Sequence, residues 1–210
     1  AYANAYLHQY PIDGCPDRVT NVVYMGMGEP LANYDRVRES LRRLIDVAGM
    51  SARSVTVSTV GAVPGMLRLA EEPWPVSLAV SLHGADDKTR SRLVPLNDRY
   101  PIETVLAAAE TYFAAKGRRL SIEWTLIDGA NDSDHQARLL ATIARRLRAH
   151  VNVIPLNPTP LSPDRPSDAT RIHGFVETLL ASGANATLRE TRGQEIDAAC
   201  GQLRLRRATE

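Results

Sequence analysis

A carboxylate at the end of an apolar strand is the first feature of this sequence that could do chemistry. Residues 22–25, Val-Val-Tyr-Met, have the pattern of a short buried strand. Gly26 and Gly28 follow, where the backbone must come close to another group, and Pro30 ends the strand with Glu29 at its exposed edge. Because a carboxylate repels phosphate, we expect a ligand with a cationic group, such as the ammonium of an amino acid. The alternative is a polar turn without a ligand.

Polar side chains also follow other predicted strands at the same level of the sheet. Each lies at or just past the carboxyl end of an apolar run: Ser58, Ser81, His83 and Asn157. In a parallel sheet these ends form one edge, so residues far apart in the sequence could face a common ligand. Each residue also has a simpler interpretation, as a turn cap, a histidine satisfied within its loop, or a turn initiator before proline. Their agreement across successive strands favours a shared site.

The composition is that of one globular domain. The chain has 210 residues, of which 44% are hydrophobic, and a net charge of +1, so it can form one sizeable core. The chain has two cysteines, Cys15 and Cys200, which lie far apart in the sequence, and this excludes a disulfide framework. The five histidines lack the spacing of metal ligands, so no metal site is expected on the chain itself. No stretch resembles a membrane span or a signal peptide, so we expect a cytoplasmic protein without a membrane partner. The arginine clusters are typical of solvated faces and do not by themselves indicate nucleic acid.

Alternating strand and helix patterns predict an α/β fold. Ser133 and Gln136 have the spacing of a capping box at a helix start, and a polar loop is expected between the third strand and the helix near residue 105. Repeated units of this kind predict parallel strands, in an open doubly wound sheet or in a partial TIM-like (β/α)6 barrel with outer helices, since a complete barrel needs about 250 residues. Strands are expected at residues 22–25, 54–58, 76–81, 120–127, 151–156 and 186–189.

Six motifs together resemble one family. The chain is similar to the radical S-adenosyl-L-methionine (SAM) RNA methyltransferases that methylate adenine carbons, and the resemblance covers residues 20–203 in family order. The last motif, Thr-Arg-Gly-Gln-Glu-Ile-Asp-Ala-Ala-Cys-Gly-Gln-Leu, is long and unusual. The matching stretches are residues 25–33, 57–59, 81–83, 94–97, 151–158 and 191–203. The resemblance implies a radical-SAM barrel over residues 19–203, preceded by a linker or helix end at 1–18 and followed by a tail at 204–210.

The resemblance also implies roles for single residues. Gly28 and Glu29 would contact the methionine part of S-adenosyl-L-methionine, in agreement with the cation expected from the carboxylate. Cys200 would carry the methyl group as a methylcysteine, although a cysteine between small residues is otherwise more often a small buried hydrophobe. Cys15 matches no motif and is interpreted as a structural thiol. The rest of the cofactor pocket would be lined by Ser58, Ser81, Leu82, His83 and Asn157.

The implied reaction is methylation of C2 of an adenosine in 23S rRNA and tRNA. An electron-poor ring carbon is a poor nucleophile, so the family uses a 4Fe–4S cluster and a radical step, with an electron donor such as flavodoxin, and we expect a monomer. Pro30 and the stretch Thr191-Arg-Gly look more like the C2 branch of the family, whereas residues 97–101 look somewhat like the branch that methylates C8.

The chain departs from the family pattern in one respect. The Cys-x-x-x-Cys-x-x-Cys motif that holds the cluster is absent, and its ligands are expected upstream of residue 1. Cys15 stands alone in a Gly-Cys-Pro turn and cannot replace them. We therefore expect these 210 residues by themselves to be inactive. A different interpretation is a non-catalytic barrel fragment that binds RNA or a protein partner.

Overall fold

Six parallel strands form one sheet in sequential order, β1 to β6, in the computed structural model, which describes residues 2–158 and 163–189. Each strand pairs only with its neighbours in the chain, as in a barrel that is opened along one side. The predicted partial (β/α)6 barrel is thereby confirmed, and the doubly wound alternative is wrong. The strands are β1 Val22–Tyr24, β2 Val55–Thr59, β3 Ser77–Ser81, β4 Ser121–Leu126, β5 His150–Pro155 and β6 Asn185–Leu188.

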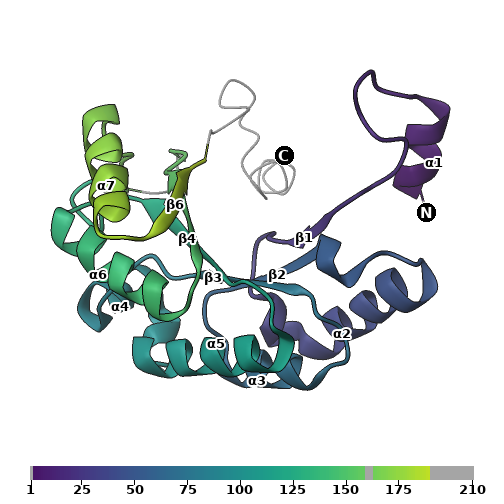
Figure 1. Cartoon of the computed structure of the whole chain (residues 1–210), viewed down its shortest axis with the longest axis horizontal. Helices are drawn as coiled ribbons and strands as arrows, with labels where there is room; N and C mark the ends of the chain where they lie inside the picture. Colours follow the sequence, from purple (N-terminus) through teal and green to yellow (C-terminus); the bar gives the residue numbers. More distant parts are fainter. Residues whose placement is uncertain (1, 159–162, 190–210) are drawn as a thin grey trace.

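Helices cover the convex side of this curved sheet, and its concave side is left facing the open part of the barrel (Figure 1). The first helix, α1, stands apart from the sheet in Figure 1 and buries none of its side chains. No helix in the described part of the chain is long and apolar enough to cross a membrane. The helices are α1 Tyr2–Gln9, α2 Tyr34–Arg42, α3 Val63–Glu71, α4 Asp87–Leu93, α5 Ile102–Lys116, α6 Asp134–Arg146 and α7 Ala169–Ala181.

The two faces of the sheet differ in chemistry because side chains alternate along each strand. One set is apolar and almost fully buried against the helices, for example Val57, Leu78, Ile122 and Val151. The alternate set lies on the concave face and is mostly polar. Strand register keeps its members side by side, as in Ser81, Glu123, Asn152 and Thr187. The core thus lies between sheet and helices, and polar groups are left where a barrel holds its ligand.

The expected polar loop after β3 is wrong in part, because it contains the short helix α4. Asp86 caps this helix by accepting a hydrogen bond from the Thr89 amide at 2.7 Å. Arg90 is fully buried and donates to Asn97 Oδ1 at 2.5 Å and to the Val60 carbonyl. The helix has no apolar stripe, so the sequence gives no periodic pattern from which to predict it. Its stability comes from the cap and from this buried arginine.

Two other expectations are refined. Ser133 caps α6 by accepting from the Gln136 amide at 3.2 Å, but the Gln136 side chain does not complete the capping box. Its Oε1 instead accepts from the Ala85 amide at 2.9 Å, which joins α6 to the β3–α4 connection. Cys15 is exposed, so it is not part of the core that a structural thiol would occupy.

Candidate functional site

The glycine turn after β1 is held by both oxygens of the Glu29 carboxylate. Gly28 has a φ of 98°, a conformation that favours glycine. Glu29 Oε1 accepts from the Leu31 amide at 2.9 Å and caps the following 3₁₀ turn, Pro30–Asn33. Oε2 accepts from the Val60 amide at 2.7 Å, just past the end of β2. A carboxylate has about four acceptor positions, so this group can hold the turn and still receive a ligand's cation.

Two of the predicted serines meet at the carboxyl ends of β2 and β3. Ser58 Oγ and Ser81 Oγ are 3.3 Å apart, and both lie on the concave face. Ser58 is buried and Ser81 is half-buried, so a ligand here would meet a pair of hydroxyls that can each donate or accept. Leu82 differs from its neighbours, because its side chain is fully buried in the core. Only its backbone could contribute to a site.

His83 occupies a special backbone position at the start of the β3–α4 connection. Its φ of 57° lies in the left-handed region, which is uncommon for any residue with a side chain. Its ring Nδ1 accepts from the Thr125 amide on β4 at 3.0 Å. Burial, together with the nearby Arg90 charge, lowers the pKa of His83 to about 4. At neutral pH the ring is therefore uncharged, and its proton lies on Nε2.

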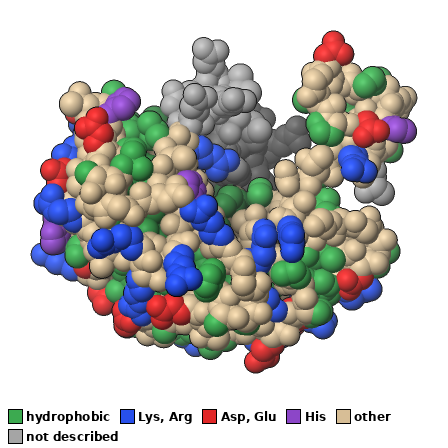
Figure 2. Space-filling model, viewed as in Figure 1, with side chains coloured by type: hydrophobic (Ala, Val, Ile, Leu, Met, Phe, Trp, Pro, Cys, Tyr) green, Lys and Arg blue, Asp and Glu red, His purple; other side chains and the backbone are tan. Residues whose placement is uncertain are grey.

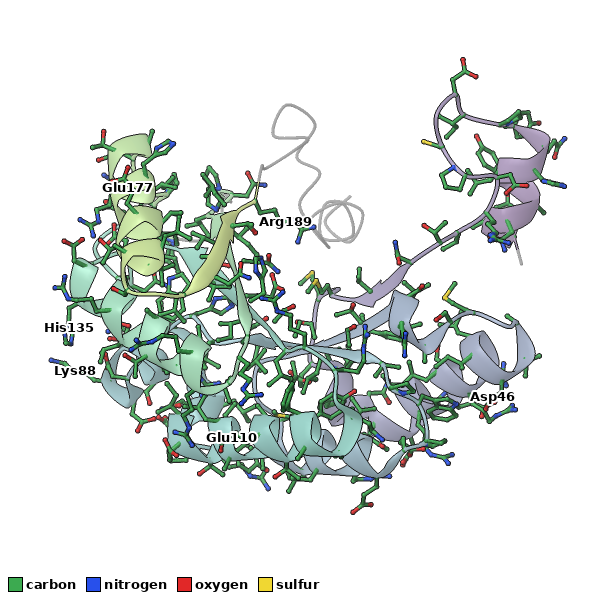
Figure 3. All side chains as sticks on the ribbon, in the orientation of Figure 1. Asp46, Lys88, Glu110, His135, Glu177 and Arg189 are labelled. Atoms are coloured by element: carbon green, nitrogen blue, oxygen red, sulfur yellow. The ribbon has the colours of Figure 1, made fainter. Side chains whose placement is uncertain are left out.

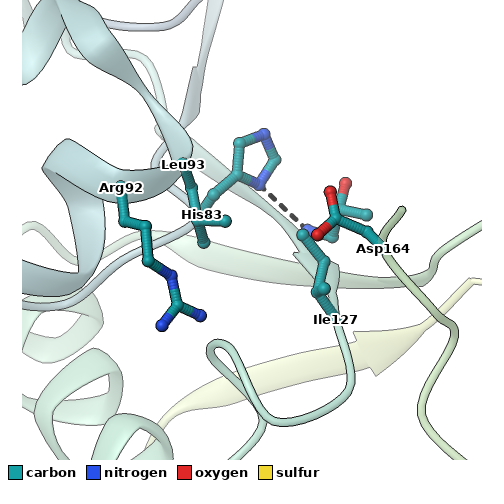
Figure 4. Close-up of a pocket in the computed structure, with 6 residues that line it drawn as sticks. His83, Arg92, Leu93, Ile127 and Asp164 are labelled. Carbon is teal, nitrogen blue, oxygen red and sulfur yellow. Dashed lines mark hydrogen bonds between the residues drawn. The ribbon is translucent and has the colours of Figure 1, made fainter. Parts of the chain in front are cut away.

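A pocket of about 500 Å³ opens beside this imidazole (Figure 4). In Figure 4 the bonded ring nitrogen faces β4, and the other ring nitrogen is turned away from that strand. Apolar and charged side chains share the lining, which suits a ligand with both a flat apolar part and polar atoms. The lining residues are His83, Arg92, Leu93, Thr125, Ile127 and Asp164.

The remaining predicted residues lie elsewhere or outside the described part. Asn157 is half-buried two residues past the end of β5, before the exposed Pro158. Cys200 lies outside the described residues. The structure therefore brings together Ser58 and Ser81, and places Glu29 and His83 at the same end of the sheet.

A buried carboxylate on the concave face was not predicted from the sequence. Glu123 is 4% exposed, and its Oε1 accepts from Asn152 Nδ2 at 2.8 Å. Its other oxygen, Oε2, has no hydrogen-bond partner among the described residues. Burial raises the pKa of Glu123, against the opposing effects of Asn152, Arg189 and His150. The available signal was one acidic residue between Ile122 and Trp124, in an otherwise apolar strand.

The polar groups continue from Glu123 across β5 to β6. Asn152 Oδ1 accepts from Thr187 Oγ1 at 3.3 Å. The two ring nitrogens of His150 each have a partner on β6, because Nε2 lies 3.0 Å from Thr187 Oγ1 and Nδ1 lies 3.0 Å from Asn185 Oδ1. Arg189 lies at the end of β6, apart from Lys88, Glu110 and His135 on the helical side (Figure 3). Figure 2 shows Lys and Arg side chains spread over this view of the molecule and not gathered in one patch.

The described residues fit an organic ligand better than a metal. The concave face offers paired hydroxyls, an unpartnered buried carboxylate oxygen and a neutral imidazole N–H, all suited to a polar cofactor such as S-adenosyl-L-methionine. Residues 2–158 and 163–189 contain no group of three or more His, Cys, Asp or Glu that could hold a metal ion. They therefore do not fit a 4Fe–4S cluster, which needs several thiolates.

The parallel partial barrel with polar groups at the carboxyl ends of its strands defines a cofactor-binding α/β barrel domain. The model of the radical SAM superfamily matches residues 13–141. This chain belongs to the radical SAM superfamily, in which S-adenosyl-L-methionine and a 4Fe–4S cluster are the cofactors.

Relatives and solved structures agree with this assignment. A probable dual-specificity RNA methyltransferase RlmN from Parafrankia sp. (strain EAN1pec) is 56% identical over 196 residues, which are 91% of this chain and 51% of that protein. Another, from Frankia alni, is 52% identical over 96% of this chain and 49% of that protein. The crystal structure of a radical SAM methyltransferase from Sphaerobacter thermophilus has a TM-score of 0.81 and 49% identity, and covers 88% of this chain and 55% of that one. The chain spans about half the length of the curated relatives it matches.

Proposed function

We propose that this chain is the S-adenosyl-L-methionine-binding part of an RNA methyltransferase that methylates C2 of an adenosine in 23S rRNA and tRNA. The observation that carries the proposal is the 56% identity to an RNA methyltransferase over 91% of the chain. The proposal includes a monomer that acts in the cytoplasm with an electron donor such as flavodoxin.

The polar groups at the carboxyl ends of the strands support the cofactor part of this proposal. Gly28 and Glu29 would receive the methionine end, because the carboxylate is the acidic group at the turn after β1 and attracts an ammonium. Ser58 and Ser81 would bond the polar atoms of the nucleoside, and Asn157 and the Leu82 backbone would complete the lining. When bound, S-adenosyl-L-methionine supplies an electrophilic methyl group. Cys200 is the proposed methyl-carrying thiol.

Binding to the 210-residue chain tests the cofactor part. Isothermal titration calorimetry with S-adenosyl-L-homocysteine should give saturable binding. Ser58→Ala and Ser81→Ala should each weaken it by about tenfold, the contribution of one hydrogen bond. Ser77→Ala is the matched control, because Ser77 begins β3 and lies on the same face at the other end of the strand. Equal affinities in all four proteins would contradict the proposed site.

Nucleoside analysis tests the reaction. Deleting the encoding gene from its host should remove 2-methyladenosine from digested 23S rRNA and tRNA, as measured by mass spectrometry. A copy with Cys200→Ala should not restore it, whereas a copy with Cys15→Ala should. Loss of 8-methyladenosine instead would assign the protein to C8 methylation. Unchanged RNA with retained RNA binding would support a non-catalytic binding module.

A further inference from the structure

Asn131 joins the two turns that form the His83 site. This side chain is fully buried, in the turn between β4 and α6. Its Nδ2 donates to the His83 carbonyl at 2.9 Å and to the Thr125 carbonyl at 2.8 Å. Its Oδ1 accepts from the Ile127 amide at 2.8 Å. Both amide hydrogens and the amide oxygen are therefore used, and only an asparagine side chain supplies this set at this length.

The bonds of Asn131 lie on both sides of the contact that orients the imidazole. The Thr125 amide donates to His83 Nδ1, and the carbonyls of the same two residues are both held by Asn131. His83 needs such support because its left-handed backbone is sparsely populated by residues with a side chain. A ring whose Nδ1 accepts a backbone hydrogen bond must carry its proton on Nε2, the nitrogen turned away from β4 in Figure 4.

We propose that Asn131 is a positioning residue that holds His83 as an uncharged imidazole whose Nε2–H donates a hydrogen bond to an acceptor atom of the ligand. The proposal rests on the proposed function for the identity of that ligand. An ammonium cannot accept this bond, so the cationic end of the ligand lies at Glu29, and an acceptor such as a heteroaromatic nitrogen or a carboxylate oxygen lies at His83. Glu29 and His83 would together set the direction in which the cofactor binds.

Three charged side chains lie around His83. Arg90 and Arg92 come from α4, where Arg90 is buried and Arg92 lines the pocket, and Asp164 lines it from the loop after β5. Burial and the Arg90 charge both lower the pKa of the imidazole. A neutral ring that is bonded at Nδ1 is left with Nε2–H as its donor.

The first experiment observes the tautomer directly in the unaltered chain. Long-range ¹H–¹⁵N spectra of histidine-labelled protein distinguish the two nitrogens, and the His83→Gln spectrum assigns the signal among the five histidines. We expect a single Nε2–H tautomer that does not titrate near neutral pH. A ring protonated on Nδ1, an equal mixture, or an imidazolium at pH 7 would overturn the proposal. This measurement needs no Asn131 variant to fold.

The second experiment separates positioning from general stability. Asn131→Ser should convert His83 to a mixture of tautomers and weaken S-adenosyl-L-homocysteine about tenfold. Tyr112→Phe is the control, because Tyr112 is also fully buried and its hydroxyl donates to the Val76 carbonyl at 2.8 Å, before the start of β3 and away from His83. It should lower the melting temperature while the His83 signals and the affinity stay unchanged. Unchanged His83 signals in Asn131→Ser would sink the proposal.

The two readouts also distinguish this proposal from the proposed function. If S-adenosyl-L-homocysteine does not bind the unaltered chain but Asn131→Ser alters the tautomer, the positioning role stands and the cofactor assignment fails. If the ligand binds and the tautomer does not respond to Asn131→Ser, the cofactor assignment stands and the positioning role fails.

Discussion

At the scale of single residues, two carboxylates on the same sheet do different work. Glu29 receives two backbone amides in an accessible turn, so its charge is compensated locally. Glu123 is buried, and one of its oxygens has no partner in the described part of the chain. An unpaired buried acceptor costs stability, and a donor supplied by a ligand would remove that cost. The effect of Glu123 on the free energy of unfolding can therefore be measured without any ligand.

Glu123→Gln should change how stability depends on pH. Burial raises the pKa of Glu123 above its ordinary value of 4.5, so the folded chain keeps this proton to higher pH than the unfolded chain. By linkage, the Glu123 contribution lowers stability as pH rises through the folded pKa, and glutamine has no such titration. The free energy of unfolding of the variant minus that of the original should therefore increase as the pH rises above 4.5, the ordinary pKa of the group, in urea titrations. A pH-independent difference would contradict the buried charge.

Glu103→Gln provides the control of opposite sign. Arg146 lowers the pKa of the exposed Glu103, so its contribution is lost as pH falls through the folded pKa. The corresponding difference for this variant should be small, because solvent screens an exposed pair.

At the scale of elements, glycines show where a turn or a close approach decides the fold. Gly28 adopts a left-handed φ, whereas its neighbour Gly26 does not, and both have open space where a Cβ would lie. Gly84 and Gly174 differ in the space around them and not in φ. A Cβ on Gly84 would lie 2.5 Å from the Arg90 amide nitrogen, whereas a Cβ on Gly174 would have no atom within 4 Å.

Gly28→Ala should destabilise the chain by about 1 kcal/mol, since a Cβ is disfavoured at this φ. Because the turn also positions Glu29, affinity for S-adenosyl-L-homocysteine should fall in the same variant. Gly26→Ala should change neither quantity appreciably. Thermal unfolding and calorimetric titration measure both, and identical behaviour of the two variants would show that φ at Gly28 is unimportant.

Gly84→Ala should destabilise by about 1–3 kcal/mol, because the contact is with backbone that cannot easily move. Gly174→Ala in the interior of α7 should instead stabilise by about 0.5–1 kcal/mol, the difference in helix propensity. Denaturant midpoints of the two variants should shift in opposite directions. A shift in the same direction would mean that the connection around Arg90 can rearrange.

At the scale of the whole molecule, one face of the sheet is packed and the other is polar. The helices pack against the apolar face, where the residues of the core cluster are buried, so the core forms without a ligand on the concave face. A ligand that binds there stabilises the fold by mass action alone.

S-adenosyl-L-homocysteine at a hundredfold excess over its dissociation constant should raise the free energy of unfolding by about 2.7 kcal/mol. The increase should be visible as a higher melting temperature in differential scanning fluorimetry and smaller in Ser81→Ala at the same concentration. Methionine alone should give a smaller shift, because it lacks the nucleoside. No shift at any ligand concentration would count against the proposed cofactor site.

The order and type of the main elements could be predicted from the sequence. Apolar periodicity is a property of neighbouring residues, so all six strands lie within a few residues of their expected positions. Membership of the radical SAM superfamily was likewise visible in contiguous motifs, and the match of the superfamily model to residues 13–141 confirms it. Helix α4 was missed because its stability comes from Asp86 and the buried Arg90, a cap and a distant contact that leave no periodic pattern.

The positions of the strands along the chain, the glycine turn with its carboxylate and the superfamily could therefore be inferred from the sequence, whereas the sequential order of the strands in the sheet could not. Only the tertiary structure decided that Ser58 and Ser81 meet, that Val60 binds Glu29, and that Glu123 is buried on the concave face. It also decided the protonation of His83, whose partner Thr125 lies 42 residues away. The reason is physical: periodicity acts between neighbours in the chain, whereas these contacts depend on strand register and on turn conformations that bring distant backbone amides within reach of a side chain.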